Sequence, residues 1–213
     1  PACIPDRMPQ FIEDFPTMNA PILDLFRRRF ACHAFLPDRV IPRADLETVL
    51  EAGRLSPSSF GLEHWKFIVV ESAATRAALQ SACFNQPQVG NASAVVVILA
   101  KTAELAPDTD YLRTLMAREY PGDALAPALD NYRTFHAMTD VKAWSITQCH
   151  IAAANMMTAA TAVGLDSCAI GGFLADQVAR ILDIDRARHE IALILPLGYC
   201  AETAPDKQRL PLT

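Results

Sequence analysis

Residues 92–100 read ASAVVVILA, and this stretch decides the fold. It is a continuous apolar run rich in β-branched side chains, which is typical of a strand covered on both faces. Two further strands are predicted before and after it in the chain, at residues 65–70 (WKFIVV) and 191–196 (IALILP). Helices are predicted between these strands. This alternation of helices and buried strands favours a three-layer core of the α/β or α+β class.

Start signals and apolar spacing predict four short helices and one long helix. The long helix is expected to begin after Asp140 and to run through Val163, with Gly164 as a left-handed terminator. Apolar and small residues surround its axis, so we expect it to be buried all round, against its own sheet or a partner subunit. The first short helix is expected at residues 21–29, with Asn19 as its cap, and the second begins at Pro42 and ends before Pro57. The third is expected at residues 72–82, with Ser72 as its cap, and the fourth at residues 175–182.

Residues 107–139 are polar, carry scattered aromatic side chains and are only weakly helical in pattern. We expect this segment to be a mobile helical excursion over the core, and therefore a lid. The 213 residues fall within the range of one globular domain, and neither a linker nor an internal repeat is visible. We therefore expect residues 1–213 to form a single domain.

Composition limits the partners that this chain can bind. A net charge of -5 and a pI near 5.5 argue against the broad basic face that nucleic acids or anionic membranes require, so any phosphate site must be local. The one long apolar stretch, residues 141–165, fails as a membrane span because polar side chains interrupt it. These interruptions are Lys142, Gln148, His150 and Asn155.

The cysteines are scattered and contain no C-x-x-C pair, in a chain too large to need disulfide bonds for stability. We expect reduced and mostly buried thiols. The chain opens without the short apolar segment and basic flank of a secretory signal, so we predict a cytoplasmic location. The six cysteines are Cys3, Cys32, Cys83, Cys149, Cys168 and Cys200.

Several common catalytic motifs are missing. The sequence contains no G-x-G-x-x-G after a strand, no G-x-x-x-x-G-K-[ST], no G-x-S-x-G and no H-E-x-x-H. Rossmann, P-loop, serine hydrolase and zincin interpretations therefore lose their main signal. The five histidines have no metal-ligand spacing, so we expect no metal site.

Two basic clusters lie far apart in the sequence. Residues 27–29 are consecutive arginines, which can simply complement the dipole of a helix C-terminus. Alternatively, one guanidinium turns inward and binds a phosphate. In the tail, Lys207 and Arg209 project to the same side of an extended segment and can form a cationic clamp, although solvated charges are the commoner outcome.

Two segments rich in small residues also have two interpretations. Residues 56–65 (SPSSFGLEHW) make a turn between a helix and a strand, which is structural or presents hydroxyls and backbone groups to a ligand. Residues 168–173 (CAIGGF) make an ordinary bend, or their paired glycines let backbone N–H groups approach a flat ligand.

The order and spacing of these four segments resemble the FMN-dependent nitroreductases, from about Ile22 to the C-terminus. The resemblance implies an α+β, three-layer nitroreductase-like fold with a mixed central sheet. It also implies a homodimer with FMN at the subunit interface and an extended C-terminal tail that reaches the partner subunit.

The resemblance also assigns residues to the flavin. Residues 29–35 are similar to the family's R-x-S-x-[KR]-x-F, which puts Arg29 on the FMN phosphate, and Ala31 and His33 along the cofactor. Residues 170–173 are similar to P-[IV]-[GE]-G-F, so the Gly171 N–H is expected to donate to flavin N5, with Ile170 and Gly172 beside it. Lys207 and Arg209 match the K-x-R-L-P phosphate clamp. Pro57, Ser58, Ser59 and Gly61 are expected to reach the flavin of the other subunit, and Asn85 and Gln88 to lie beside the ring.

Several positions depart from the family pattern. Gly61, Glu63 and His64 replace asparagine, glutamine and proline, and Ala31 replaces serine. His33 and Gln88 replace basic residues near the flavin ring. Because positive charge stabilises the reduced anionic ring, we predict a lower two-electron potential than in relatives with lysines at these positions.

The activity that the resemblance implies is reduction of nitroaromatics, quinones or free flavins by NAD(P)H in ping-pong kinetics. The flavin carries the redox chemistry, so no acid or base side chain is obligatory. Tyr132 and Phe135 are expected either to line the acceptor pocket or to be packing residues. The alternatives are another FMN-dependent reaction, such as reductive dehalogenation, desaturation or flavin breakdown, and a non-catalytic FMN-binding module.

Overall fold

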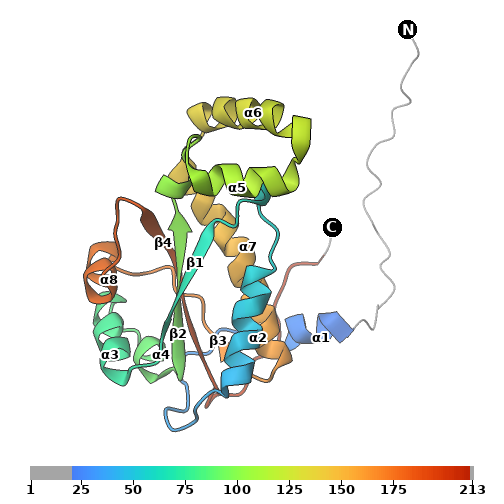
Figure 1. Ribbon diagram of the computed structural model, residues 1–213. Coiled ribbons are helices and arrows are strands. Elements are labelled where there is room, and N and C mark those ends of the chain that lie inside the picture. The colour runs from blue at the N-terminus through green and yellow to red at the C-terminus, as the bar shows by residue number, and fades with distance from the viewer. Residues whose placement is uncertain (1–20, 212–213) are drawn as a thin grey trace.

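The computed structural model, which describes residues 21–211, is built around one four-stranded sheet with helices on both faces (Figure 1). The strands lie in the order β1 (Trp65–Val70), β2 (Ala94–Lys101), β4 (His189–Gly198) and β3 (Asp166–Ser167). The predicted three-layer α+β core is confirmed. The three predicted strands are all present, and the bounds of β1 match the prediction at both ends.

The prediction of a mixed sheet is wrong, because every pair of neighbouring strands is antiparallel. The cause lies in the connection between β1 and β2, which consists of α3 (Ala73–Ala82) and the short helix α4 (Pro87–Asn91). Together these helices return the chain to the end of the sheet where β1 finishes, so Val70 pairs with Val95. Among the described residues, parallel pairing is confined to an isolated bridge between Ala31 and Ser167.

Strand β2 is buried on both faces, as its sequence predicts. Val96 and Ile98 contribute to the core beneath α2 (Arg43–Arg54) and α7 (Val141–Ala162), which cover one face of the sheet (Figure 1). Val95 and Val97 contribute to a second core beneath α3, α4 and α8 (Ala175–Leu182) on the opposite face.

Helix ends follow the predicted signals. Asp140 caps α7 by accepting the Ala143 N–H at 3.0 Å, and Gly164 closes that helix with a φ of +80°. Ser72 caps α3, whereas Asn19, the predicted cap of α1 (Pro21–Arg28), lies outside the described residues. Within one chain, α7 is buried on one side only, since Ile151 is 39% exposed. We predicted that either the sheet or a partner subunit would bury the rest of α7, and burial by a partner subunit stays a prediction.

The expected lid consists of two antiparallel helices at one end of the sheet (Figure 1). They are α5 (Asp110–Glu119) and α6 (Leu125–Met138), preceded by the short turn η2 (Ala103–Leu105) and joined through η3 (Gly122–Ala124). The lid has its own hydrophobic core, which also takes in Leu62 from the turn before β1. The members of this lid core are Leu62, Leu105, Leu112, Leu115, Met116, Leu129 and Tyr132.

The prediction that all cysteines are reduced is wrong. Cys32 and Cys200 form a disulfide, with their Cα atoms 5.8 Å apart across a sequence separation of 168. The bond forms because the segment after α1 pairs with the residues that follow β4, through a bridge between Phe35 and Cys200. Cys83, Cys149 and Cys168 are free and buried as predicted, and Cys3 lies outside the described residues.

None of the helices formed by residues 21–211 combines the length and the apolarity that a membrane span requires.

Candidate functional site

Three cations from opposite ends of the sequence lie together. The Lys207 ammonium donates to the backbone carbonyl of Arg29, which follows the last residue of α1. Partial burial and the nearby charges of Arg29 and Arg209 lower the pKa of Lys207. None of the ion pairs among the described residues includes any of these three side chains. A local concentration of positive charge that is not paired with carboxylates favours an anionic ligand such as a phosphate.

The segment after Arg29 presents alternate residues to solvent. Ala31 and His33 are exposed, whereas Cys32 and Phe35 are buried beneath it. The His33 Nδ1 lies 3.5 Å from the Nε2 of Gln88, whose side chain is buried. The structure therefore brings Arg29, His33 and Gln88 to one region, as the sequence predicts.

The glycine bend after β3 joins the same region. The Gln88 Nε2 donates to the Gln86 Oε1 at 3.2 Å, and the Gln86 Nε2 donates to the Gly172 carbonyl at 3.1 Å. Gln86, which the sequence analysis did not single out, is thus the side chain that ties α4 to the glycine bend. No sequence motif distinguishes it from other surface glutamines.

Gly171 has an open backbone. The preceding Ile170 is buried and is paired with Ile194 through two backbone hydrogen bonds, which anchors the bend. The Gly171 N–H makes no hydrogen bond to a described backbone or side-chain group, and a Cβ built at this position meets nothing within 4 Å. A free N–H on an unobstructed surface is the feature that a flat ligand needs from a bend of this kind.

Asn85 lies at the edge of this region. It is exposed, and its φ of +58° follows the equally left-handed φ of +55° at Phe84. Its backbone N–H donates to the Gln80 carbonyl at 2.9 Å, which holds the turn. Asparagine tolerates this conformation better than most residues, so the loop can present the Asn85 amide outward.

The turn of residues 57–61 is not brought to these groups within one chain. It contains η1 (Ser59–Gly61) and lies where β1 begins and β2 ends, next to the lid. The Ser58 Oγ accepts the Glu63 N–H at 2.9 Å, and the Ser59 N–H donates to the Gln148 Oε1 at 2.9 Å. The length of β2, roughly 25 Å at the usual strand rise, separates this turn from α4 and the cation cluster.

A lid residue explains why position 61 is glycine. A Cβ at Gly61 would lie 2.6 Å from the Glu119 Cγ, and the φ of +64° also favours glycine. The neighbouring Glu63 forms an ion pair with Arg118 at 2.6 Å. The lid residues Arg118 and Glu119 therefore occupy the space that longer side chains of the turn would need. Neither residue is predictable from the sequence, because nothing local to α5 marks it.

The two aromatic candidates of the lid have different environments. Tyr132 is buried, and its hydroxyl donates to the Leu105 carbonyl at 2.6 Å, so the structure supports its packing interpretation. Phe135 is partly exposed and lies 5.4 Å from the ring of Phe60, between ring centroids. Trp144 of α7 packs on Phe135 at 4.9 Å. Of the two candidates, Phe135 is the more exposed, although it also packs against the lid core.

His64 is a buried group that the sequence analysis considered only as a departure from the family pattern. Its ring meets Trp144 edge-on at 4.4 Å, and its Nδ1 has no hydrogen-bond partner among the described residues. Burial lowers its pKa to about 4. His64 is therefore a neutral structural residue at physiological pH.

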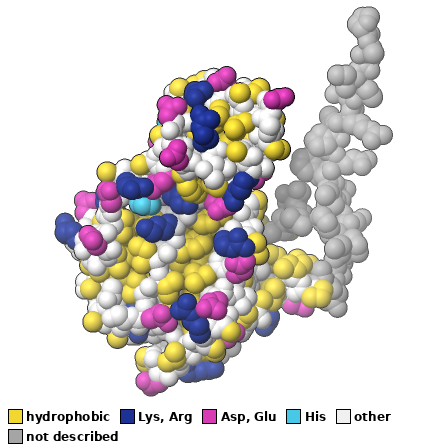
Figure 2. Space-filling model, in the orientation of Figure 1, with side chains coloured by type: hydrophobic (Ala, Val, Ile, Leu, Met, Phe, Trp, Pro, Cys, Tyr) yellow, Lys and Arg dark blue, Asp and Glu magenta, His cyan; other side chains and the backbone are white. Residues whose placement is uncertain are grey.

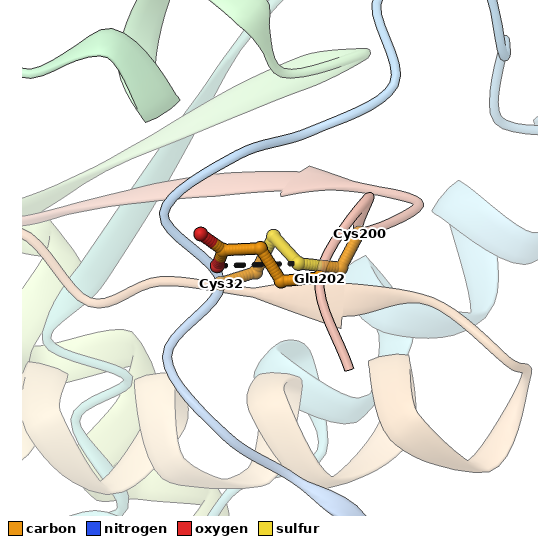
Figure 3. A group of neighbouring side chains, drawn as sticks. All are labelled: Cys32, Cys200 and Glu202. Atoms are coloured by element: carbon orange, nitrogen blue, oxygen red, sulfur yellow. Dashed lines mark hydrogen bonds between the residues drawn. A yellow bond between two sulfur atoms is a disulfide. The ribbon is translucent and has the colours of Figure 1, made fainter. Parts of the chain in front are cut away.

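One group in the described part of the chain has the residue types of a metal site. It consists of Cys32, Cys200 and Glu202, drawn in Figure 3, where a Glu202 carboxylate oxygen lies 4.0 Å from the Cys200 sulfur. The two sulfurs are bonded to each other, so they are not available as thiolate ligands.

The arrangement defines an α+β protein in which an unpaired cation cluster lies beside an exposed glycine N–H. The nitroreductase family model matches residues 26–199. A Staphylococcus epidermidis protein named as an NAD(P)H nitroreductase is 37% identical over 200 residues, which cover 87% of this chain and 90% of that protein. YfkO of Bacillus subtilis, also named as an NAD(P)H nitroreductase, is 34% identical over 208 residues, with 90% and 94% of the two chains covered. The chain belongs to the nitroreductase family.

Solved structures share this fold. A structure assigned as a nitroreductase of Exiguobacterium sibiricum, in complex with FMN, has a TM-score of 0.78 and 22% identity, and covers 91% of this chain and 94% of that chain. CLA-ER, an enone reductase from a gut-bacterial fatty acid saturation pathway, has a TM-score of 0.73 and 25% identity, with 90% and 94% covered.

Proposed function

We propose that this protein is an FMN-dependent NAD(P)H oxidoreductase that reduces nitroaromatics, quinones or related small acceptors with ping-pong kinetics. The observation that carries the proposal is the unpaired cluster of Arg29, Lys207 and Arg209 beside the free Gly171 N–H. Family membership supports it, as do the names of the relatives. Bound FMN would supply the two-electron chemistry, by taking hydride from NAD(P)H at N5 and passing it to the acceptor.

Each group of residues has a distinct task in this proposal. Arg29, Lys207 and Arg209 bind the dianionic phosphate, for which the guanidinium fork is suited. The Gly171 N–H donates to the flavin N5 position and so orients the ring. His33 and Gln88 lie along the other ring edge, with Ala31, Asn85, Ile170 and Gly172 around it. No side chain of the site needs to transfer a proton in the hydride step.

We also propose that the active form is a homodimer in which Pro57, Ser58, Ser59 and Gly61 of one protomer reach the flavin of its partner. The turn lies far from the cation cluster of its own chain, which supports a contribution from a second copy. Strand β1 is an unpaired edge of the sheet, and a groove beside it is lined by Leu50, Phe67 and Val69. Hydrophobic side chains gather over this part of the molecule in Figure 2. Exposed edges and apolar patches are commonly covered by association, and we propose that the partner's tail contributes here.

The decisive test of the cofactor site is FMN binding by the purified protein. Arg209→Gln removes one charge-assisted contact, which costs about 1.5–3 kcal/mol and therefore weakens FMN binding roughly 10- to 150-fold. Arg28→Gln, an exposed arginine one residue before Arg29, is the matched control and should leave binding unchanged. FMN fluorescence quenching measures both. A colourless protein that takes up no FMN would refute the cofactor assignment.

The activity itself is tested by rapid mixing of holoprotein with NADH and NADPH. Bleaching of the flavin absorbance by either nucleotide supports the oxidoreductase proposal, and absence of bleaching by both refutes it. The acceptor screen should include α,β-unsaturated ketones, because the enone reductase CLA-ER shares the fold at 25% identity. Reductive dehalogenation, desaturation and flavin breakdown are the other reactions to assay, and a flavin inert to every acceptor would favour the non-catalytic module. A cytoplasmic location also stays our proposal, to be tested by cell fractionation.

A further inference from the structure

The Cys32–Cys200 disulfide joins the two segments that carry the phosphate-binding cations. Cys32 lies between Ala31 and His33, and Cys200 follows β4 at the point where the tail begins. Two backbone hydrogen bonds flank the bond, from Leu36 to Tyr199 and from Ala201 to Ala34, each of 2.8 Å. The crosslink therefore ties the base of the tail to the segment that begins at Arg29.

Beyond Ala201 the tail has little else to hold it. No backbone–backbone hydrogen bond among the described residues involves positions 202–211, and most of these side chains are exposed. Its described contacts with the Arg29–His33 segment are the donation of Lys207 to the Arg29 carbonyl and a 3.4 Å contact from the His33 N–H to Glu202. A covalent bond at the base of such a tail limits how far Lys207 and Arg209 can move from Arg29.

We propose that the Cys32–Cys200 disulfide is a redox-controlled clasp that sets how tightly the protein retains its flavin. Oxidised, the clasp holds Lys207 and Arg209 beside Arg29; reduced, it leaves the base of the tail to hydrogen bonds alone, so the tail moves more and the phosphate site is weakened. The inference rests on the proposed function, because it assumes that the phosphate belongs to FMN. With the proposed cytoplasmic location, a switch agrees better than a permanent crosslink, because disulfides in a reducing compartment are usually transient, catalytic or redox-sensing.

Cys32 faces away from the cofactor side of its segment. Its side chain is fully buried, whereas the neighbouring Ala31 and His33 are exposed on the opposite side. The disulfide thus supports the binding segment from behind and acts on flavin retention through the position of the backbone. Direct electron transfer from the flavin is not part of the proposal.

The chemistry of opening needs a dithiol reductant. One thiolate of the dithiol attacks the Cys200 sulfur, which is the more exposed of the two, and the Cys32 sulfur leaves as a thiolate that takes up a proton. The second thiol of the reductant, as its thiolate, then displaces Cys200, which also gains a proton. The protein gains two electrons and two protons, and the reductant becomes a disulfide.

Glu202 regulates access to this reaction. Its carboxylate lies 4.0 Å from the Cys200 sulfur (Figure 3), so its charge repels an attacking thiolate. Glu202→Gln should therefore open the bond faster than wild type at equal dithiol concentration. The rate is followed by quenching with an alkylating agent and mass spectrometry of the Cys32 and Cys200 peptides.

The test compares FMN binding by air-oxidised and dithiothreitol-treated protein, with the state of the bond verified by alkylation. Reduction, or Cys200→Ser, should weaken FMN binding about tenfold, the effect of withdrawing one charge-assisted contact. Cys83→Ser, which changes a buried free thiol outside the bond, should leave the redox dependence unchanged. Trypsin cleavage after Lys207 and Arg209 reports on the tail without reference to flavin, and should become faster on reduction.

The outcomes separate this inference from the proposed function. Equal FMN binding in both verified states overturns the clasp and leaves the function untouched. If neither the oxidised nor the reduced protein binds FMN, the cofactor assignment fails. In that case, a rate of tryptic cleavage that does not change on reduction overturns the clasp as well. Absence of the Cys32–Cys200 bond after air oxidation would also overturn it.

Discussion

At the scale of single residues, the ring end of the site differs from the family more than the phosphate end does. Arg29, Lys207 and Arg209 match the motif and lie together, whereas His33 and Gln88 replace basic residues and contact each other at 3.5 Å. The cations that we propose to bind the cofactor phosphate thus match the family motif, while the positive charge expected beside the ring is reduced.

Replacing the lost cations should raise the flavin potential. His33→Lys or Gln88→Lys adds positive charge near the reduced ring, and about 1 kcal/mol of extra stabilisation corresponds to roughly 20 mV for a two-electron couple. Redox titration of the holoprotein measures the shift. Thr48→Lys adds the same charge on the exposed side of α2 and should leave the potential unchanged. A lower potential in either site variant would contradict the electrostatic explanation.

His64 makes stability depend on pH. Burial lowers its folded pKa to about 4, below the value near 6.5 of an unfolded histidine. The unfolded chain therefore binds a proton as pH falls through 6.5, while the folded protein does so only near pH 4. The free energy of unfolding is undiminished by this group above pH 6.5 and falls by on the order of 3 kcal/mol between pH 6.5 and 4.

Urea unfolding at pH 7.5 and pH 5 tests this dependence. His64→Phe keeps an aromatic ring against Trp144 and removes the titration, so it should flatten the loss of stability over this range. His150→Gln, at an exposed position on α7, is the matched control and should retain the wild-type slope. A His64→Phe curve as steep as wild type would assign the acid sensitivity to other groups.

At the scale of elements, sequence patterns predicted regular segments and missed what depends on contacts between segments. The β-branched run of β2 and the Asp140 and Gly164 signals of α7 are local, and both elements form as predicted. Helix α4 is five residues long, too short for helical periodicity to appear, so the sequence did not reveal how the chain returns to pair β2 antiparallel with β1.

In the candidate site, too, local motifs were predictable from the sequence and contacts between distant segments were not. Its two motif-bearing ends, Arg29 and residues 207–209, were predictable because their spacing resembles the family. Glu119 above Gly61 and Gln86 beneath Gly172 were not, because α5 and α4 acquire these contacts only by packing against segments distant in sequence.

Helix α2 packs closely on α7 and β1 at Gly53, which gives a prediction for a substitution at this position. A Cβ there would lie 2.8 Å from the Met156 sulfur and 2.8 Å from the Phe67 ring. Gly53→Ala gains about 1 kcal/mol of helix propensity, yet overpacking costs about 1–3 kcal/mol, so we expect net destabilisation. Chemical denaturation measures it. The exposed Thr48→Ala on the same helix controls for propensity, and a Gly53→Ala protein as stable as that control would show that the side chains relax freely.

At the scale of the whole molecule, the disulfide connects the beginning and the end of the described chain. Sequence could not have identified the pair, because six cysteines allow many pairings and the two partners are 168 residues apart. The same separation makes the crosslink important for stability, since a closed loop of this length restricts the unfolded chain strongly.

Reduction should therefore destabilise the whole domain. The loop-entropy model gives an upper value of about 5 kcal/mol for a loop of this length. Thermal unfolding of FMN-free protein with and without dithiothreitol measures the difference, and Cys32→Ser should match the reduced wild type. Cys149→Ser, which removes a buried free thiol, is the control. Dithiothreitol should lower its unfolding midpoint as much as it lowers that of the wild type. Identical unfolding midpoints with and without the bond would show that the crosslink contributes nothing to folding.

The separate hydrophobic core of the lid has a practical consequence for protein engineering. Because the lid core around Leu112, Met116 and Tyr132 is separate from the cores on the two faces of the sheet, we expect that the segment from Ala103 to Met138 can be exchanged for another helical hairpin without reopening those cores. The residues to keep in such a graft are those that meet the turn before β1, chiefly Tyr111, Arg118 and Glu119. Libraries confined to this hairpin therefore test whether it sets the range of acceptors in the proposed function, while the cation cluster stays constant.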